Sequence, residues 1–348
     1  MAISTVDTAT ATADTTNGTA PVDKENRQRT FDHTPTVTIL IPCYNEEAVL
    51  PVLFDRLDKL RSNARETADY RFMFVDDGSK DATRDMIADY ADGRNHVDFI
   101  ILSRNFGKEQ AMLAGIDAID SDAMAIIDAD LQDPPELIPD MVDLWLRGYD
   151  DVYARRRTRR GESLVKRATS HLYYRVLQAM SPVSIQVDTG DFRLLDRKCI
   201  LALRRLRETG RNSKALFSWI GFRKIEFLYD RDARAAGKSK WSYPKLIGLA
   251  MDGIMSFSTA PLRIAFCCGL AVSVAALAYA VVIIARTLVY GVDVPGYASL
   301  LVVVLTLGGI QLLALGIIGE YLGRVFTEVK RRPGYLVQEA RINNEYQD

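Results

Sequence analysis

Three carboxylates and a side-chain amide stand close together in the sequence MAIIDADLQDPPEL, which spans residues 124–137. They are Asp128, Asp130, Asp133 and Gln132, and they directly follow an apolar run. Like charges at the end of a buried element repel one another, and removing them from water costs several kcal/mol. A divalent cation would compensate for both effects. Oxygen ligands without Cys or His suit Mg²⁺ or Mn²⁺, so we expect one of these ions here.

The spacing of the acidic residues supports this interpretation. Asp128 and Asp130 are two residues apart, and side chains at this spacing in a strand point to the same side. Gln132 adds a neutral oxygen atom, whereas Asp133 is expected to cap the turn or helix that follows. The competing interpretation of the whole segment is a solvated turn at the end of a strand.

A second group of residues is basic and lies in ARRRTRRGESLVKRATSHLYY, residues 154–174. Lys166 and Ser170 are four residues apart, so on a helix they share a face, and Arg167 and His171 do likewise. The sequence therefore predicts a positively charged helix face. The competing interpretation is a basic loop that faces anionic lipid headgroups, worth about 1 kcal/mol for each charge.

The segments that must position these groups alternate between strand and helix patterns. Strands are predicted in TVTILIPCYNEE (36–47), YRFMFVDDGS (70–79), VDFIILS (97–103) and AMAIIDAD (123–130). Helices are predicted between them, in AVLPVLFDRLDKLRS (48–62), DATRDMIADYA (81–91) and GKEQAMLAGIDAI (107–119). This alternation predicts an α/β fold with a mostly parallel sheet that helices cover on both faces.

Polar clusters follow all four predicted strands: PCYNEE, DDGS, SRNFGK and DADLQD. Ligands of parallel sheets bind beyond the carboxyl ends of the strands, so these clusters are expected to meet at one edge. Lys108 begins a predicted helix, where backbone N–H groups favour phosphate, although an ordinary surface lysine is an equal alternative. The sequence has no G-x-G-x-x-G after the first strand and no P-loop motif, which argues against those two phosphate sites.

Composition excludes several other functions. The net charge of −1 over 348 residues does not suggest nucleic acid binding. None of the four cysteines has metal-ligand spacing, and the three histidines leave little material for a His-based metal site or a Ser-His-Asp triad. Residues 1–34 contain few large apolar side chains and no signal-peptide pattern, so we expect this segment to be disordered.

Two uncharged apolar runs, at residues 264–285 and 298–319, each have 22 residues. A helix of that length spans roughly 33 Å, which matches the hydrocarbon core of a bilayer. The link between them is short and carries only Arg286 and Asp293 as charged residues. The two runs therefore predict a transmembrane hairpin over residues 263–322.

Charges around this hairpin predict its orientation. Arg263 precedes the first run, and Arg324 and the basic residues 330–332 follow the second. The positive-inside rule then places both chain ends in the cytoplasm, so residues 323–348 form a cytoplasmic tail of a multi-pass plasma-membrane protein. Residues 236–262 mix basic, aromatic and aliphatic side chains, which is typical of amphipathic helices in the headgroup region, with a soluble amphipathic helix as the alternative.

The four polar clusters in this order, with GDFRLLDR (190–197) and the C-terminal hairpin, resemble family 2 glycosyltransferases of the GT-A fold. Within that family the chain is similar to the polyprenyl-phosphate glycosyltransferases, which include bactoprenol glucosyltransferases and dolichol-phosphate mannose synthases. The resemblance covers about residues 36–330 and implies a GT-A domain at 35–235. It also implies an enzyme that transfers a sugar from a nucleotide sugar to a polyprenyl phosphate such as undecaprenyl phosphate.

The resemblance assigns roles to single residues. Asp130 and Asp191 are implied to be catalytic, and the ligands of Mg²⁺ or Mn²⁺ are Asp128, Asp130 and Gln132. The nucleotide sugar is bound by Pro42, Tyr44, Asn45, Glu46, Asp76, Lys108, Asp128, Arg234 and Lys238. The acceptor phosphate is bound by Lys166 and Ser170, with Arg155 and Arg167 as helpers. Asp191 would orient the sugar hydroxyls or the phosphate, and its alternative role is to cap the loop before FRLLD.

The reaction that the resemblance implies needs no strong base. The second pKa of a phosphate monoester is about 6, so the acceptor is already anionic at neutral pH. In-line attack at the anomeric carbon inverts its configuration. UDP-glucose is the first choice of donor, and GDP-mannose or another UDP-sugar remains an alternative.

Two other functions compete with this one. A processive polysaccharide synthase typically carries Q-x-x-R-W and more membrane helices than the two predicted here, and this sequence has no Q-x-x-R-W. A non-catalytic membrane scaffold would only bind the nucleotide sugar. The segment LGGIQLLALG offers small residues for helix contacts, so a homo-oligomer is possible.

Overall fold

The computed structural model describes residues 28–157, 189–229, 260–290, 296–343 and 345–347. The chain divides into two compact units. The described residues before 230 and after 332 build the first unit, and those from 260 to 332 build the second.

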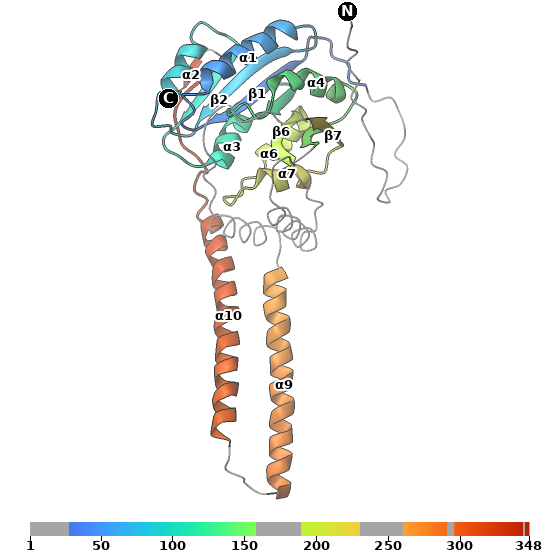
Figure 1. Cartoon of the computed structure of the whole chain (residues 1–348), viewed down its shortest axis with the longest axis vertical. Coiled ribbons are helices and arrows are strands. Elements are labelled where there is room, and N and C mark those ends of the chain that lie inside the picture. The colour runs from blue at the N-terminus through green and yellow to red at the C-terminus, as the bar shows by residue number, and fades with distance from the viewer. Residues whose placement is uncertain (1–27, 158–188, 230–259, 291–295, 344, 348) are drawn as a thin grey trace, which may run out of the picture. The chain divides into compact units, whose positions relative to one another are not determined.

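The first unit is built on one sheet, which contains nine strands among the described residues (Figure 1). Their order across the sheet is β7-β5-β6-β4-β1-β2-β3-β8-β9. The bounds are β1 Thr36–Cys43, β2 Asp69–Asp76, β3 Val97–Leu102, β4 Ala123–Ile126, β5 Asp151–Arg156, β6 Thr189–Asp196, β7 Lys224–Tyr229, β8 Val337–Ile342 and β9 Glu345–Gln347. Only β6 and β8 run against the others, so the predicted mostly parallel sheet is confirmed.

Helices cover both faces of this sheet. One face packs against α1 (Leu50–Asn63), α2 (Thr83–Ala91) and α4 (Ile138–Leu146), with a one-turn 3₁₀ helix at Pro135–Leu137. The other face packs against α3 (Lys108–Ala118), α6 (Arg197–Arg204) and α7 (Ser213–Trp219). Strand β1 shows why the centre of a strand covered on both faces is apolar: Ile39 contributes to the first core, whereas Leu40 contributes to the second.

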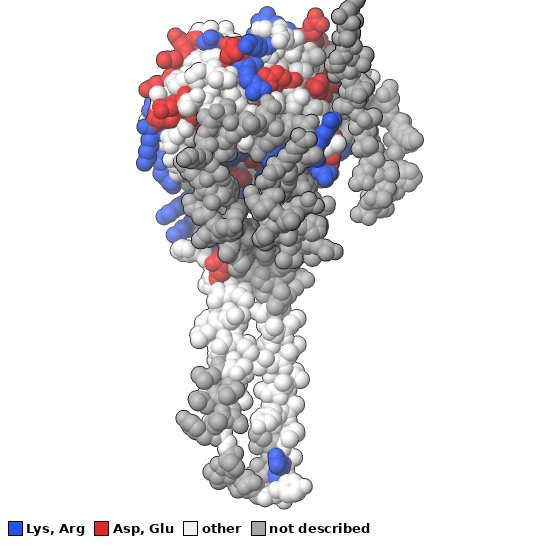
Figure 2. Space-filling view, in the orientation of Figure 1, with Lys and Arg blue, Asp and Glu red and all other residues white. Residues whose placement is uncertain are grey.

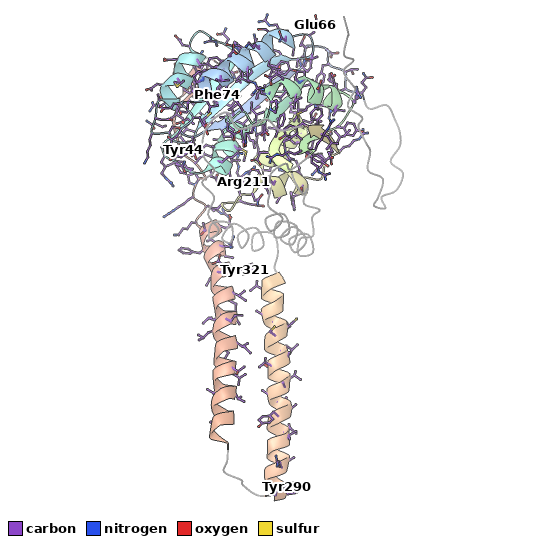
Figure 3. All side chains as sticks on the ribbon, viewed as in Figure 1. Tyr44, Glu66, Phe74, Arg211, Tyr290 and Tyr321 are labelled. Atoms are coloured by element: carbon purple, nitrogen blue, oxygen red, sulfur yellow. The ribbon has the colours of Figure 1, made fainter. Side chains whose placement is uncertain are left out.

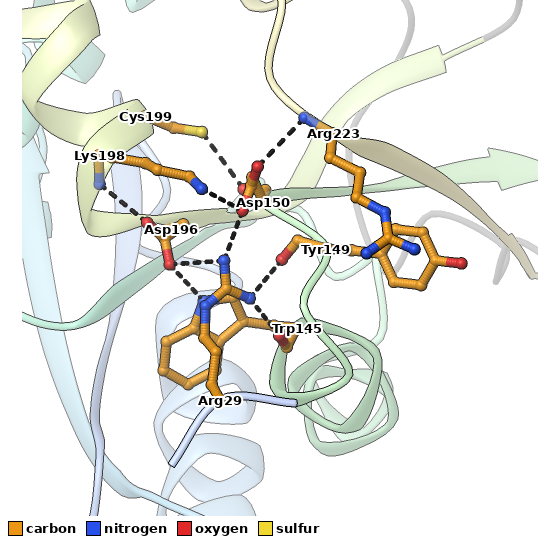
Figure 4. Close-up of polar contacts among 8 residues, drawn as sticks. All are labelled: Arg29, Trp145, Tyr149, Asp150, Asp196, Lys198, Cys199 and Arg223. Atoms are coloured by element: carbon orange, nitrogen blue, oxygen red, sulfur yellow. Dashed lines mark hydrogen bonds and ion pairs between the residues drawn. The ribbon is translucent and has the colours of Figure 1, made fainter. Parts of the chain in front are cut away.

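The folded part begins before the predicted start at residue 35. The guanidinium of Arg29 lies 5.4 Å from the centre of the Trp145 ring and forms ion pairs with Asp150 and Asp196 (Figure 4). The expected disorder of residues 1–34 therefore does not hold for Arg29 and the residues that follow it. Residues before position 28 lie outside the described part of the chain.

The residues after the second apolar run return to the first unit. Strand β8 pairs antiparallel with β3, and the N–H of Ser103 donates to the carbonyl of Leu336 at 2.9 Å. The hydroxyl of Tyr335 donates to Asp117 on α3 at 2.7 Å. The expected tail at 323–348 is thus corrected, because its described residues extend a helix and then complete the edge of the sheet.

The second unit contains α9 (Ala260–Tyr290) and α10 (Tyr297–Val329), which include both apolar runs found in the sequence. The visible surfaces of these helices carry few charged side chains (Figure 2). Among the described residues, Thr306–Val329 is long and apolar enough to cross a membrane, and the apolar stretch Ala265–Tyr279 of α9 is shorter. The predicted interfacial helices at 236–262 lie almost entirely outside the described residues.

Candidate active site

A cleft of about 260 Å³ opens at the carboxyl ends of the central strands. Strand β1 lies between β4 and β2, so the chain order reverses at β1, and ligands of α/β sheets bind at such a point. The residues that line the cleft are Pro42, Cys43, Tyr44, Glu46, Asp77, Asn105, Gly107, Lys108, Ala111, Asp128, Ala129 and Asp130. The structure therefore brings all four polar clusters of the sequence to one cleft.

Lys108 connects two carboxylates of the cleft that are far apart in the sequence. Its ammonium nitrogen lies 2.5 Å from Asp128 Oδ1 and 2.5 Å from Asp191 Oδ2. Asp128 follows β4, whereas Asp191 lies on β6, which pairs with β4. Lys108 is thus an electrostatic link between the predicted metal ligands and the second predicted catalytic residue.

Charge, rather than burial, decides the ionisation of this group. Burial alone would lower the pKa of Lys108, but Asp128 and Asp191 outweigh it and hold that pKa above its ordinary value. Burial alone would raise the pKa of Asp191, but Lys108, with further positive charge from Lys214, holds it below its usual range. At neutral pH the lysine is an ammonium ion and Asp191 is a carboxylate.

The loop before α3 fixes the backbone of Lys108. Gly107 has a φ of +96°, a conformation that side chains disfavour, and the helix begins directly after it. The carboxylate of Asp77 accepts the N–H groups of Phe106 at 2.7 Å and of Gly107 at 2.9 Å. Asp77 lines the cleft and was not among the predicted site residues, although it lies in the DDGS cluster.

The neighbouring Asp76, a predicted nucleotide contact, is held by the turn that follows β2. It is 1% exposed, does not line the cleft, and accepts hydrogen bonds from the N–H and the hydroxyl of Ser79. Burial raises its pKa. Asp76 therefore shapes the turn after β2 in this structure, and Asp77 is the member of the pair that faces the cleft.

The loop after β1 is tied to the start of α2. Asn45 has a φ of +54°, and its side-chain oxygen accepts the N–H of Lys80 at 2.8 Å. The N–H of Glu46 donates to Thr83 Oγ1 at 2.8 Å. Asn45 does not line the cleft, whereas Pro42, Tyr44 and Glu46 do, and Tyr44 is 41% exposed (Figure 3).

The loop after β4 presents two carboxylates to the cleft and buries the third. Asp128 and Asp130 line the cleft, and Asp130 accepts the N–H of Gln132 at 3.1 Å. Asp133 is 4% exposed and accepts the Tyr229 hydroxyl at 2.7 Å, which agrees with a structural role. Gln132 is not among the residues that line the cleft.

The oxygen atoms of Asp128 and Asp130 fit a hard divalent cation whose other ligands come from the substrate and water. Asp128 and Asp130 present part-exposed carboxylate oxygens on one loop. In the part of the chain that the structure describes, no three acidic, His or Cys side chains form a complete metal site. Mg²⁺ is commonly held by one or two carboxylates together with substrate phosphates and water, so two protein ligands suffice.

Asp191 has one oxygen that the described protein does not satisfy. Asp191 Oδ2 pairs with Lys108, but Oδ1 is buried and has no hydrogen-bond partner among the described residues. An unsatisfied buried acceptor is costly, so a hydrogen-bond donor placed at Oδ1 would be stabilising.

Of the predicted acceptor-phosphate residues, the structure describes only Arg155. Arg155 on β5 donates to Glu226 on β7 at 2.9 Å. The other predicted acceptor-phosphate residues, Lys166, Arg167 and Ser170, lie outside the described residues. The same is true of Arg234 and Lys238, which were predicted to bind the nucleotide sugar.

Comparison with known proteins decides the family. The model named "Glycosyl transferase family 2" matches residues 38–203, and the model named "GtrB C-terminal hairpin" matches residues 260–325. An uncharacterized glycosyltransferase of Synechocystis sp. is 50% identical over 87% of this chain and 95% of its own length. The chain belongs to glycosyl transferase family 2.

Other relatives of this glycosyltransferase carry more specific names. A prophage-derived bactoprenol glucosyl transferase of Shigella flexneri is 39% identical over 88% of this chain and 99% of its own length. Among solved structures, glucosyl-3-phosphoglycerate synthase of Mycobacterium tuberculosis in complex with Mg²⁺ and UDP is 19% identical, with a TM-score of 0.45. That match covers 64% of this chain and 77% of the synthase.

Proposed function

We propose that this glycosyltransferase moves a hexose from a nucleotide sugar, with UDP-glucose as first choice, to undecaprenyl phosphate or another polyprenyl phosphate. The transfer takes place at the cytoplasmic face of the plasma membrane and inverts the anomeric carbon. The observation that carries this proposal is the cleft at β1 and β4, where Asp128 and Asp130 face the same space as Lys108. The bactoprenol glucosyl transferases that match almost the whole chain support the choice of acceptor and sugar.

The donor side of the reaction needs positive charge near the diphosphate. Asp128 and Asp130 would hold Mg²⁺ or Mn²⁺, which supplies charge neutralisation at the departing nucleotide. Pro42, Tyr44 and Glu46 line the same cleft, where they would contact the base and ribose. Lys108 carries a mobile positive charge at the start of α3, within reach of a phosphate group in the cleft.

The acceptor side needs orientation rather than proton removal. A phosphate monoester oxygen is already an anionic nucleophile at neutral pH, so positioning and charge provide the rate enhancement. Asp191 would accept a hydroxyl of the sugar through its unsatisfied Oδ1 and thereby orient the anomeric carbon. The residues proposed for the acceptor phosphate are Lys166, Ser170, Arg155 and Arg167, and those proposed for the diphosphate are Arg234 and Lys238.

The path of the chain supports a membrane hairpin. Strands β7 and β8 belong to one sheet, and α9 and α10 lie between them in the sequence. A segment that leaves and re-enters the same folded unit crosses a bilayer an even number of times. Two crossings agree with the basic residues that flank both ends of the hairpin, because positive charge favours the cytoplasmic side.

A donor panel tests this proposal. The full-length protein in detergent is supplied with undecaprenyl phosphate, Mg²⁺ and one of UDP-glucose, UDP-galactose, UDP-GlcNAc or GDP-mannose, and the glycolipid is measured by chromatography. We expect one sugar on the lipid, formed fastest from UDP-glucose. Sugar chains of increasing length would instead indicate a processive synthase, and nucleotide-sugar binding without any glycolipid would indicate a scaffold.

A further inference from the structure

We propose that Lys108 holds the place of the divalent cation until the donor binds. In the protein alone, its ammonium group occupies one oxygen of Asp128, a carboxylate that the cation needs. The cation therefore binds well only when a nucleoside diphosphate attracts Lys108 away from it. This inference rests on the proposed function, because it takes Asp128 and Asp130 as the protein ligands of the cation.

The geometry of the ammonium group is that of a bridging cation. The Nζ atom of Lys108 contacts one oxygen of Asp128 and one of Asp191, each at 2.5 Å. A carboxylate oxygen that binds an ammonium at this distance directs its lone pair to that charge. Asp128 Oδ1 cannot give the same lone pair to a metal ion until the ammonium leaves.

The side chain of Lys108 can move away from the two carboxylates while its backbone stays in place. Its side chain is 40% exposed and is a flexible four-carbon chain, so the ammonium can move through solvent. The first turn of α3 is fixed by its neighbours, because Glu109 accepts the N–H of Ser213 at 2.8 Å and Gly107 is held by Asp77. The exchange therefore requires side-chain rotation rather than a shift of the helix.

A charge argument links this exchange to the donor. Without nucleotide, a dication at Asp128 and Asp130 would stand close to an ammonium group, and the two positive charges repel. A diphosphate brings enough negative charge to pair with both of them. Cation and nucleotide should consequently bind cooperatively, and each should raise the affinity of the other by the same factor.

Direct measurement of Mn²⁺ binding tests the idea. The full-length protein in detergent is titrated with Mn²⁺ alone and then with Mn²⁺ plus UDP, and free Mn²⁺ is followed by electron paramagnetic resonance. We expect Lys108→Met to bind Mn²⁺ alone about tenfold more tightly than the wild type, because the competing charge is gone. We also expect UDP to raise the Mn²⁺ affinity of this variant much less than that of the wild type.

Three further variants make the result specific. Lys108→Gln is neutral but can still donate a hydrogen bond to Asp128, and it should bind Mn²⁺ as Lys108→Met does. It replaces the methionine variant if that variant does not fold. Lys214→Met removes a nearby positive charge that acts on Asp191, and it should leave Mn²⁺ binding within about twofold of the wild type. Asp130→Asn should abolish tight Mn²⁺ binding in every background.

The outcomes separate this inference from the proposed function. If the Lys108 variants bind Mn²⁺ no more tightly than the wild type, or if Lys214→Met gives the same gain, the place-holding role is wrong. In either case the proposed function stands if the wild type binds Mn²⁺ in the presence of UDP and the Asp130→Asn variant does not. If Asp130→Asn changes nothing, the cation site itself is wrong.

Discussion

Two clusters in the first unit each surround one cation with two carboxylates, but they differ in how completely the protein satisfies those carboxylates. In the first cluster the cation is Arg29 in the N-terminal segment, and in the second it is Lys108 at the start of α3. We call them the N-terminal cluster, which contains Arg29, Asp150 and Asp196, and the cleft cluster, which contains Lys108, Asp128 and Asp191.

Every carboxylate oxygen of the N-terminal cluster has a partner (Figure 4). Asp150 pairs with Arg29 and Lys198 through one oxygen and accepts the N–H of Arg223 through the other. Asp196 accepts the indole N–H of Trp145 at 2.9 Å through Oδ2, and its Oδ1 caps α6. A cluster that is complete without a ligand has a structural role.

The cleft cluster is incomplete by the same standard. Asp191 Oδ1 is buried without a partner among the described residues, and the cation is a lysine with a 40% exposed side chain. The difference between the clusters is that one buried acceptor of the cleft cluster has no donor among the described residues, whereas every carboxylate oxygen of the N-terminal cluster has one. The following predictions test this contrast.

The largest effect is expected for Asp130→Ala. The loss of a cation ligand should lower glycolipid formation by about 1,000-fold, because charge on the departing nucleotide is no longer neutralised. The free energy of unfolding should change by less than about 0.5 kcal/mol, since no core contact is lost. Activity and thermal unfolding are measured on one preparation. EDTA should reduce the wild type to the level of this variant and leave the variant unaffected.

The second prediction compares Asp191→Asn with Asp196→Asn, two isosteric substitutions on the same strand β6. Asp191→Asn should lower activity by about 100-fold, because the amide loses the negative charge that orients the sugar. Asp196→Asn should leave activity unchanged and lower the stability by about 1 kcal/mol, because asparagine can cap α6 but cannot pair with the charge of Arg29. Equal losses of activity in the two variants would remove the distinction between the clusters.

The third prediction concerns Arg29→Ala. Arg29 donates to the carbonyl of Tyr149 at 2.7 Å as well as to both carboxylates of its cluster. Its loss should lower the free energy of unfolding by about 2 kcal/mol, since hydrogen bonds to charged groups contribute most when they are partly buried. The measurement is denaturant unfolding followed by tryptophan fluorescence. The turnover number should match that of the wild type, and a large loss of activity would assign this cluster to the site.

The sequence is enough to predict the central elements and where the polar clusters meet. Apolar β-branched runs define β1 to β4, and parallel strands bring their carboxyl ends together, so PCYNEE and DADLQD had to lie close. Neighbouring residues were harder to assign, because side chains alternate along the chain at the end of β2. Both Asp76 and Asp77 are buried, and of the two only Asp77 lines the cleft.

Long-range pairings were not predictable from local patterns. The partner of Lys108 on β6 lies 83 residues away, and no periodicity links the two. Arg29 lies in a polar segment whose composition predicts disorder. Composition alone does not show that this arginine pairs with two carboxylates far along the chain. Strand β8 is short, charged and placed after the hairpin, so its pairing with β3 depends on tertiary contacts alone.

The smallest effect is expected for Lys198→Met, and it sharpens the definition of a complete cluster. Lys198 pairs with Asp150 at 2.7 Å, but its side chain is 49% exposed, so solvent screens the interaction. Its loss should lower stability by about 0.5 kcal/mol or less, because Arg29 still pairs with Asp150. The change should disappear in high salt, which weakens exposed ion pairs more than buried ones. A cost as large as that of Arg29→Ala would show that the cluster depends on all its charges together, and not on the buried arginine.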